Sequence, residues 1–175
     1  MKNRNALLDY VNEKKCKIAV EVGSYAGEFA LEIMKRTKIE RLYCVDSFDY
    51  RNVSEKNRDN GAYERFYERL NGYIDEGRLY PYKRTSPQAA EGFPMNSFDF
   101  IYLDAGHAYI DVKKDLIAWY PRLKLGGIIA GHDYKNLGHK KQVKKAVDEY
   151  FELGELVVNS TDKCRGEVPS FWVQT

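Results

Sequence analysis

The residues from Glu21 to Gly27 combine an acid with two glycines directly after an apolar run, in the order Glu-Val-Gly-Ser-Tyr-Ala-Gly. Glycines at Gly23 and Gly27 allow a tight turn and a close approach of a ligand to the backbone. A helix that follows such a turn directs its free amides at that ligand. The GxxxG spacing differs from the GxGxxG pattern of dinucleotide enzymes. Because Glu21 would repel a pyrophosphate, a cationic ligand is favoured, and a turn without a ligand is the alternative.

Three further apolar runs end in polar residues. Asp46 follows the second run, Asp104-Ala-Gly-His107 follows another, and His132-Asp133 follows a glycine-rich one. A carboxylate at the position of Asp46 can accept hydrogen bonds from both hydroxyls of a ribose, although it can also cap a turn. Together with the glycine turn, Asp46 favours a nucleoside ligand.

Strands and helices that would position these residues alternate along the whole chain. Helical periodicity of the apolar residues predicts helices near residues 6–11, 29–36, 63–74, 87–90, 112–123 and 141–151. Apolar runs of strand length predict strands at residues 17–22, 41–46, 79–84, 98–103 and 127–131, and near residues 156–158 and 170–173. This alternation is typical of a doubly wound α/β fold, in which helices cover both faces of a mostly parallel sheet. Ligands of such sheets bind beyond the carboxyl ends of the strands, where the four polar segments lie.

Length and composition predict one globular domain over residues 1–175, since 175 residues with 43% hydrophobic and 31% charged residues are ordinary for such a domain. The apolar runs are too short for a transmembrane helix, and charges near the start argue against a signal peptide. A net charge of +2 gives no indication of nucleic-acid binding. The three cysteines, Cys16, Cys44 and Cys164, form no metal-binding pair, so we expect free thiols and a cytoplasmic location.

The polar segments and their surroundings resemble a known family. The segments EVGSYAG, VDSF, FDFIYLDAGHAY and LKLGGIIAGHDY are similar to those of class I S-adenosylmethionine-dependent methyltransferases, and the last two resemble the group of sugar and macrolide O-methyltransferases. The resemblance covers residues 17–150. It implies a Rossmann-like sheet of seven strands whose last strand is antiparallel, with S-adenosylmethionine across the ends of the first two strands.

The resemblance also implies roles for individual residues. Glu21 would lie at the amino-acid end of the cofactor, Gly23 would approach it, and Asp46 would bind its ribose. Phe48, or Ser86 with Gln88, would border the adenine. The cofactor-binding residues expected on this basis are Glu21, Gly23, Ser24, Tyr25, Gly27, Asp46, Ser47, Phe48, Ser86 and Asp104.

Metal-dependent members of this family bind Mg²⁺ at the ends of the fourth and fifth strands. The resemblance therefore implies a divalent cation held by Asp104, His132 and Asp133, with His107 as general base and Asp104 beside it as catalytic residues. His132 departs from the acidic pair of the sugar enzymes, and imidazole suits Mn²⁺, Fe²⁺ or Zn²⁺ better than Mg²⁺. A hydrogen-bonded network that braces two loops is the alternative interpretation of this cluster.

The expected reaction is transfer of a methyl group to a hydroxyl of a sugar, phenol or polyketide, without a nucleic-acid or membrane partner. Contacts with this acceptor would come from residues 47–60, the Tyr-rich helix after them, and residues 159–168. Two alternatives remain: an NAD(P)-dependent oxidoreductase on a similar sheet, and a non-catalytic domain that binds the cofactor or a protein. A homo-oligomer in which a second subunit covers the site is also compatible with the sequence.

Overall fold

A computed structural model describes residues 1, 3–49, 61–138, 141–162 and 168–175 of the chain. Seven strands form one sheet in the order β3-β2-β1-β4-β5-β9-β8. The strands of this sheet are β1 (Ile18–Val22), β2 (Arg41–Asp46), β3 (Leu79–Lys83), β4 (Phe98–Leu103), β5 (Leu123–Gly131), β8 (Asn159–Ser160) and β9 (Phe171–Gln174).

The sheet is parallel from β3 to β5, while β9 runs antiparallel to both β5 and β8. The predicted doubly wound sheet with an antiparallel last strand is therefore confirmed. In register, Val22 of β1 lies beside Val45 of β2 and Leu103 of β4. The strands β1, β2 and β4 consequently end at one level, and the residues that follow them share one edge of the sheet.

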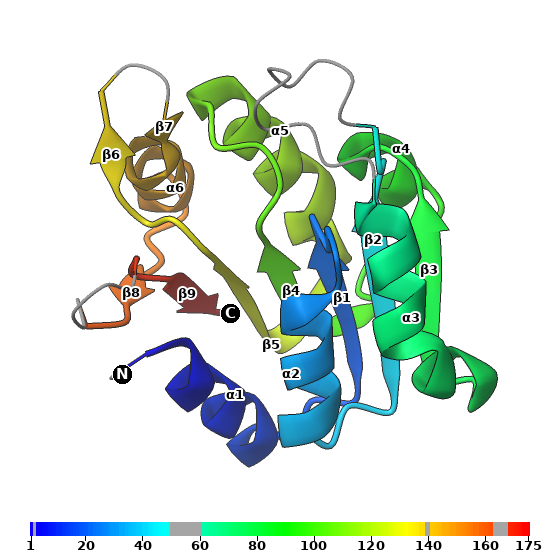
Figure 1. Cartoon of the computed structure of the whole chain (residues 1–175). Helices are drawn as coiled ribbons and strands as arrows, with labels where there is room; N and C mark the ends of the chain where they lie inside the picture. The colour runs from blue at the N-terminus through cyan, green and yellow to red at the C-terminus, as the bar shows by residue number, and fades with distance from the viewer. Residues whose placement is uncertain (2, 50–60, 139–140, 163–167) are drawn as a thin grey trace.

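In the described part of the chain, six α-helices cover the two faces of the sheet, three on each (Figure 1). They are α1 (Arg4–Glu13), α2 (Glu28–Arg36), α3 (Ala62–Asp75), α4 (Ser86–Glu91), α5 (Tyr109–Trp119) and α6 (Val143–Glu152). Alternation along the strands divides the core between these faces: Tyr102 packs with α1, α2 and α3, whereas its neighbours Ile101 and Leu103 pack with α4, α5 and α6. Both faces are buried, as expected for a parallel sheet.

The predicted helix over residues 112–123 is wrong at both ends. Helix α5 starts at Tyr109 and stops at Trp119, and a 3₁₀ turn, η2 (Tyr120–Arg122), follows it. Pro121 explains the stop, because proline has no N–H to donate and disfavours helical geometry in the residue before it. Leu123 then opens β5, four residues earlier than predicted, and pairs with Phe98.

The segments after β5 differ from the expectation more strongly. A two-stranded ribbon of β6 (Asn136–Leu137) and β7 (Lys141–Gln142) precedes α6, so the helix begins at Val143 and not at residue 141. The strand expected near residues 156–158 is displaced to β8. Helix periodicity at the start of α6 concealed the ribbon, because two residues are too few to show alternation.

Candidate active site

A cavity of about 730 Å³ opens at the edge where the parallel strands end. Six of the residues predicted to bind the cofactor line it: Gly23, Tyr25, Asp46, Ser47, Ser86 and Asp104. They lie at or just after the ends of β1, β2, β3 and β4, so four strand ends contribute to the cavity. The topology therefore brings together residues that are up to 81 positions apart in the chain.

Asp46 organises the backbone around this cavity. Its Oδ2 accepts a hydrogen bond from the backbone N–H of Tyr25 at 2.8 Å, and its Oδ1 accepts one from the N–H of Phe48 at 2.7 Å. Tyr25 and Phe48 both have positive φ angles, of 47° and 50°, a conformation that non-glycine residues adopt at a cost and that clusters at functional sites. Asp46 thus acts as the turn cap that the sequence allowed. A carboxylate has about four lone-pair directions, so these two hydrogen bonds are compatible with a contact to a ribose as well.

Packing against neighbouring elements requires glycine at both Gly23 and Gly27 of the first turn. Gly23 has a φ of 93°, and a methyl group there would overlap the carbonyl oxygen of Asp104. Gly27 has a φ of 78° and lies against Phe66 and Leu70 of α3. The backbone of β1 therefore approaches β4 closely, and Gly27 docks the start of α2 on α3.

Glu21 and Ser24 are buried beneath the turn, with exposed fractions of 2% and 3%. Burial raises the pKa of the Glu21 carboxyl to about 8, and the nearby Asp104 adds to the shift while Ser24 opposes it. The Oε2 atom of Glu21 has no hydrogen-bond partner among the described residues. A buried polar atom without a partner is costly, which is consistent with the expected contact with a cationic group, although Glu21 itself does not line the cavity.

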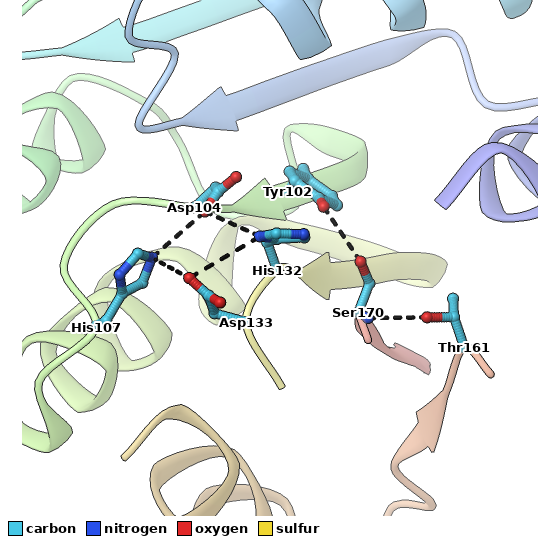
Figure 2. Close-up of polar contacts among 7 residues, drawn as sticks. All are labelled: Tyr102, Asp104, His107, His132, Asp133, Thr161 and Ser170. Carbon is cyan, nitrogen blue, oxygen red and sulfur yellow. Dashed lines mark hydrogen bonds and ion pairs between the residues drawn. The ribbon is translucent and has the colours of Figure 1, made fainter. Parts of the chain in front are cut away.

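Asp104, His107, His132 and Asp133 form a cluster at the ends of β4 and β5 (Figure 2). The Nε2 atom of His107 lies 3.1 Å from Oδ2 of Asp133 and 3.5 Å from Oδ1 of Asp104. The Nδ1 atom of His132 is farther from the same two oxygens, at 4.0 Å and 3.8 Å. Asp133 has a φ of 53°, which is a third strained residue at this edge.

This cluster contains a set of atoms that could hold a metal ion. One ligand atom each from Asp104, His107 and Asp133 lies within 4.8 Å of the others. This candidate set of ligands contains His107, whereas the resemblance to the methyltransferase family implied His132. The same contacts also connect the loops after β4 and β5, so a bracing role and a metal-binding role use the same atoms.

Several residues of the cavity were not predicted from the sequence. Arg84, Thr85, Asp111, Lys114 and Asp115 line it in addition to the expected side chains. Asp115 had a signal in the sequence, because it interrupts the apolar stripe of a helix, and the others had none. Among the expected adenine neighbours, Gln88 is exposed and accepts a hydrogen bond from Thr85, while Phe48 packs on Tyr63 and Phe66.

The fold and the motifs at the strand ends agree with the resemblance to class I S-adenosylmethionine-dependent methyltransferases. A family model described as a methyltransferase domain, Methyltransf_24, matches residues 20–134. The chain belongs to this methyltransferase family. A mimivirus relative from Acanthamoeba polyphaga mimivirus, "Uncharacterized protein R132", is 24% identical over 78% of this chain. This chain spans about 60% of the length of that relative.

Solved structures share the fold at low sequence identity. A protein from Staphylococcus aureus assigned as a caffeoyl-CoA O-methyltransferase superposes with a TM-score of 0.73 at 13% identity, covering 98% of this chain and 82% of its own. One from Clostridium thermocellum assigned as an rRNA methylase gives 0.70 at 14% identity, with 99% and 98% coverage. The N-methyltransferase NodS from Bradyrhizobium japonicum WM9 gives 0.64 at 13%, with 98% and 92% coverage. These names differ in the acceptor, so the shared fold leaves the acceptor open.

Proposed function

We propose that the protein transfers a methyl group from S-adenosylmethionine to a hydroxyl of a small molecule, with the assistance of a divalent cation. The observation that carries this proposal is the cluster of two carboxylates and two imidazoles beside the cofactor cavity. Asp104 belongs to both, since it lines the cavity and lies in the cluster. A methyl acceptor between them would therefore meet the reactive end of the cofactor.

The residues of the cluster fit a divalent cation. Carboxylate oxygens of Asp104 and Asp133 suit Mg²⁺, and the imidazole of His107 adds affinity for Mn²⁺, Fe²⁺ or Zn²⁺. Such a cation supplies positive charge that makes an acceptor hydroxyl more acidic. The protein's own contribution is to align the acceptor with the methyl donor and to take up the proton of the hydroxyl. His107 is the proposed base, oriented by Asp133, and a role as third ligand is the alternative, because both roles would use its Nε2 atom.

The acceptor class proposed is a sugar, phenol or polyketide hydroxyl. The similarity of the segments around Asp104 and Asp133 to those of sugar and macrolide enzymes supports it. Much of the expected acceptor surface, residues 50–60 and 163–167, lies outside the described residues. Membership in a methyltransferase family argues against the oxidoreductase alternative and against a purely non-catalytic domain.

We also propose that the protein acts in the cytoplasm, without a nucleic-acid or membrane partner. The balanced charge supports a chain that acts without nucleic acid. No helix of the described residues is long and apolar enough to cross a membrane. Cys16 and Cys44 are free and buried, whereas Cys164 lies outside the described residues. We keep the cytoplasm as the proposed location and a homo-oligomer as an assembly to be tested.

Calorimetric titration with Mn²⁺ in the presence of S-adenosylhomocysteine tests the metal site without knowledge of the acceptor. We expect one Mn²⁺ per chain, with binding abolished in Asp104→Ala and weakened in Asp133→Asn. Asp9→Asn, an exposed aspartate of α1, is the matched control and should bind Mn²⁺ like the wild type.

The corresponding activity test measures S-adenosylhomocysteine production with a panel of sugar and phenol acceptors. Excess chelator should abolish turnover, and Mg²⁺ or Mn²⁺ should restore it. Full turnover in excess chelator would reduce the cluster to a structural network that braces two loops.

A further inference from the structure

Asp115 is a buried acid in the apolar stripe of α5. Its side chain lies on the same side of the helix as Val112, Leu116 and Trp119, which are buried in the core, and only 6% of Asp115 is exposed. Burial of a carboxylate among apolar side chains is unfavourable unless its oxygens have hydrogen-bond donors. We therefore ask which hydrogen-bond donors each carboxyl oxygen of Asp115 has.

One oxygen of Asp115 is held by a short relay of side chains. The indole Nε1–H of Trp119 donates a hydrogen bond to Oγ of Ser86 at 2.9 Å. Indole can only donate, and a serine hydroxyl has a single hydrogen. The hydroxyl of Ser86 therefore donates a hydrogen bond to Oδ1 of Asp115. This relay fixes the orientation of the carboxyl between α4 and α5.

The other oxygen, Oδ2, accepts no hydrogen bond from any residue in the described part of the chain, and no cationic side chain there forms an ion pair with Asp115. Asp115 nevertheless lines the cofactor cavity together with Ser86 and Pro87. Burial raises the pKa of Asp115 to about 6, an effect that Ser86 opposes and Asp111 reinforces. A ligand that fills this part of the cavity with an N–H donor would supply the missing partner.

The order of residues along the edge indicates which part of the cofactor reaches Asp115. Gly23 and Tyr25 follow β1, Asp46 follows β2, and Ser86 follows β3, at the side of the cavity beyond the proposed ribose contact. With the ribose at Asp46 and the amino acid at the β1 turn, the base lies toward Ser86. The base of S-adenosylmethionine is adenine, whose exocyclic amine is a hydrogen-bond donor.

We infer that Asp115 selects the base of the cofactor by accepting a hydrogen bond from the exocyclic amine of adenine, while Ser86 and Trp119 hold its carboxyl in position. This inference rests on S-adenosylmethionine as the cofactor of the chain. It assigns base recognition to a helix that follows β4, in place of Phe48 or Gln88. Both of those side chains have other contacts in the structure.

The test compares the binding of S-adenosylhomocysteine with that of S-inosylhomocysteine by calorimetry. Hypoxanthine carries an acceptor oxygen where adenine carries the amine, so it would face the free oxygen of Asp115 unfavourably. A site built to pair with a donor rejects a ligand that lacks it. We expect the wild type to bind S-adenosylhomocysteine about 10- to 100-fold more tightly, the range for a hydrogen bond to a charged group.

In Asp115→Asn, the carboxamide can turn its amide N–H₂ toward the oxygen of hypoxanthine. We expect the preference for the adenine ligand to fall by about tenfold or more, in line with the loss of one such hydrogen bond. Asp9→Asn is the matched control: it makes the same substitution at an exposed aspartate of α1 that does not line the cavity. Its preference should stay near that of the wild type. Ser86→Ala, which frees the carboxyl, should lower the preference partly.

The outcomes separate this inference from the cofactor assignment. A wild type that binds neither ligand would overturn the assignment of S-adenosylmethionine. A wild type that binds both equally would overturn only the role of Asp115, even if Asp115→Asn failed to fold. The role is also overturned if Asp115→Asn weakens both ligands equally, because that result describes a structural residue.

Discussion

Glu21 is the residue where stability and binding are expected to conflict. Its carboxyl has a pKa near 8 in the folded protein because it is buried, compared with an ordinary value of 4.5. The folded state therefore prefers the protonated carboxyl. Its contribution to stability is fully present below pH 4.5 and is lost as the pH rises through 8.

Glu21→Gln tests this directly, since glutamine remains neutral at every pH. We expect the variant to be more stable than the wild type at pH 8–9, by on the order of a few kcal/mol, and the difference to vanish near pH 4. Urea unfolding across this range measures it. If Glu21 binds the ammonium group of the cofactor in its charged form, as the resemblance implies, the same variant should also bind S-adenosylhomocysteine more weakly, because glutamine carries no negative charge. A stability difference that does not depend on pH would contradict the buried-carboxyl explanation.

The two histidines of the cluster are distinguishable by separate substitution. If His107 acts as the general base, His107→Ala should lower kcat by roughly 10²–10⁴-fold and leave Mn²⁺ affinity nearly unchanged. If His107 is a ligand, Mn²⁺ affinity should fall together with kcat. His132→Ala is the comparison, because His132 lies farther from both carboxylates. Titration with Mn²⁺ and turnover of both variants assign the two roles, and unchanged turnover would remove His107 from the mechanism.

Much of the candidate site could be predicted from the types of residue that stand at the ends of the strands. Gly23, Asp46 and Asp104 could be assigned to one cavity since parallel strands end at the same edge. Asp115 could not be assigned in this way, because its position depends on how α5 packs on α4. Its relay with Ser86 joins residues 29 positions apart, a contact that local sequence patterns do not encode.

At the scale of elements, the turn between β1 and α2 determines how closely β1 and β4 approach. Gly23→Ala should destabilise the protein by roughly 3–5 kcal/mol, because the added methyl group meets the backbone of Asp104 and the φ angle is positive. Gly77→Ala is the control, since Gly77 also has a positive φ but has open space around it. It should cost only about 1–2 kcal/mol. Equal losses in chemical denaturation would show that the close approach to β4 is unimportant.

The five parallel strands were predictable because each is a mainly apolar segment of strand length between segments of helical periodicity, although β3 gave a weaker signal than the others. The extent of β5 was not, since Leu123 pairs with Phe98 and the register then shifts, so that the next pair is Phe100 with Ile128. The short strands β6 and β7 escaped prediction, and β8 lies just beyond the strand expected near residues 156–158. Each has only two residues, so pairing partners far along the chain decide their structure.

For the whole molecule, ligand binding should appear as added stability. S-adenosylhomocysteine at 100 times its Kd should stabilise the native state by about 2.7 kcal/mol, which corresponds to a Tm increase of about 5–10 °C for a chain of this size. NADH at the same concentration should leave Tm unchanged. Asp46→Ala should remove most of the increase, because Asp46 supports both the turns and the proposed ribose contact. A shift with NADH alone would contradict the cofactor assignment.

The antiparallel direction of β9 has a practical consequence for experiments on this protein. Gly131, next to the cluster, pairs with Phe171, and β9 then runs away from the cavity until Thr175 donates its N–H to the carbonyl of Gly127 and its hydroxyl to that of Lys124, near the start of β5. Thr175 therefore leaves the sheet at the end remote from the cofactor cavity. An affinity tag or surface tether attached at Thr175 would keep the cavity open to solution, so immobilised protein should retain access to nucleoside ligands.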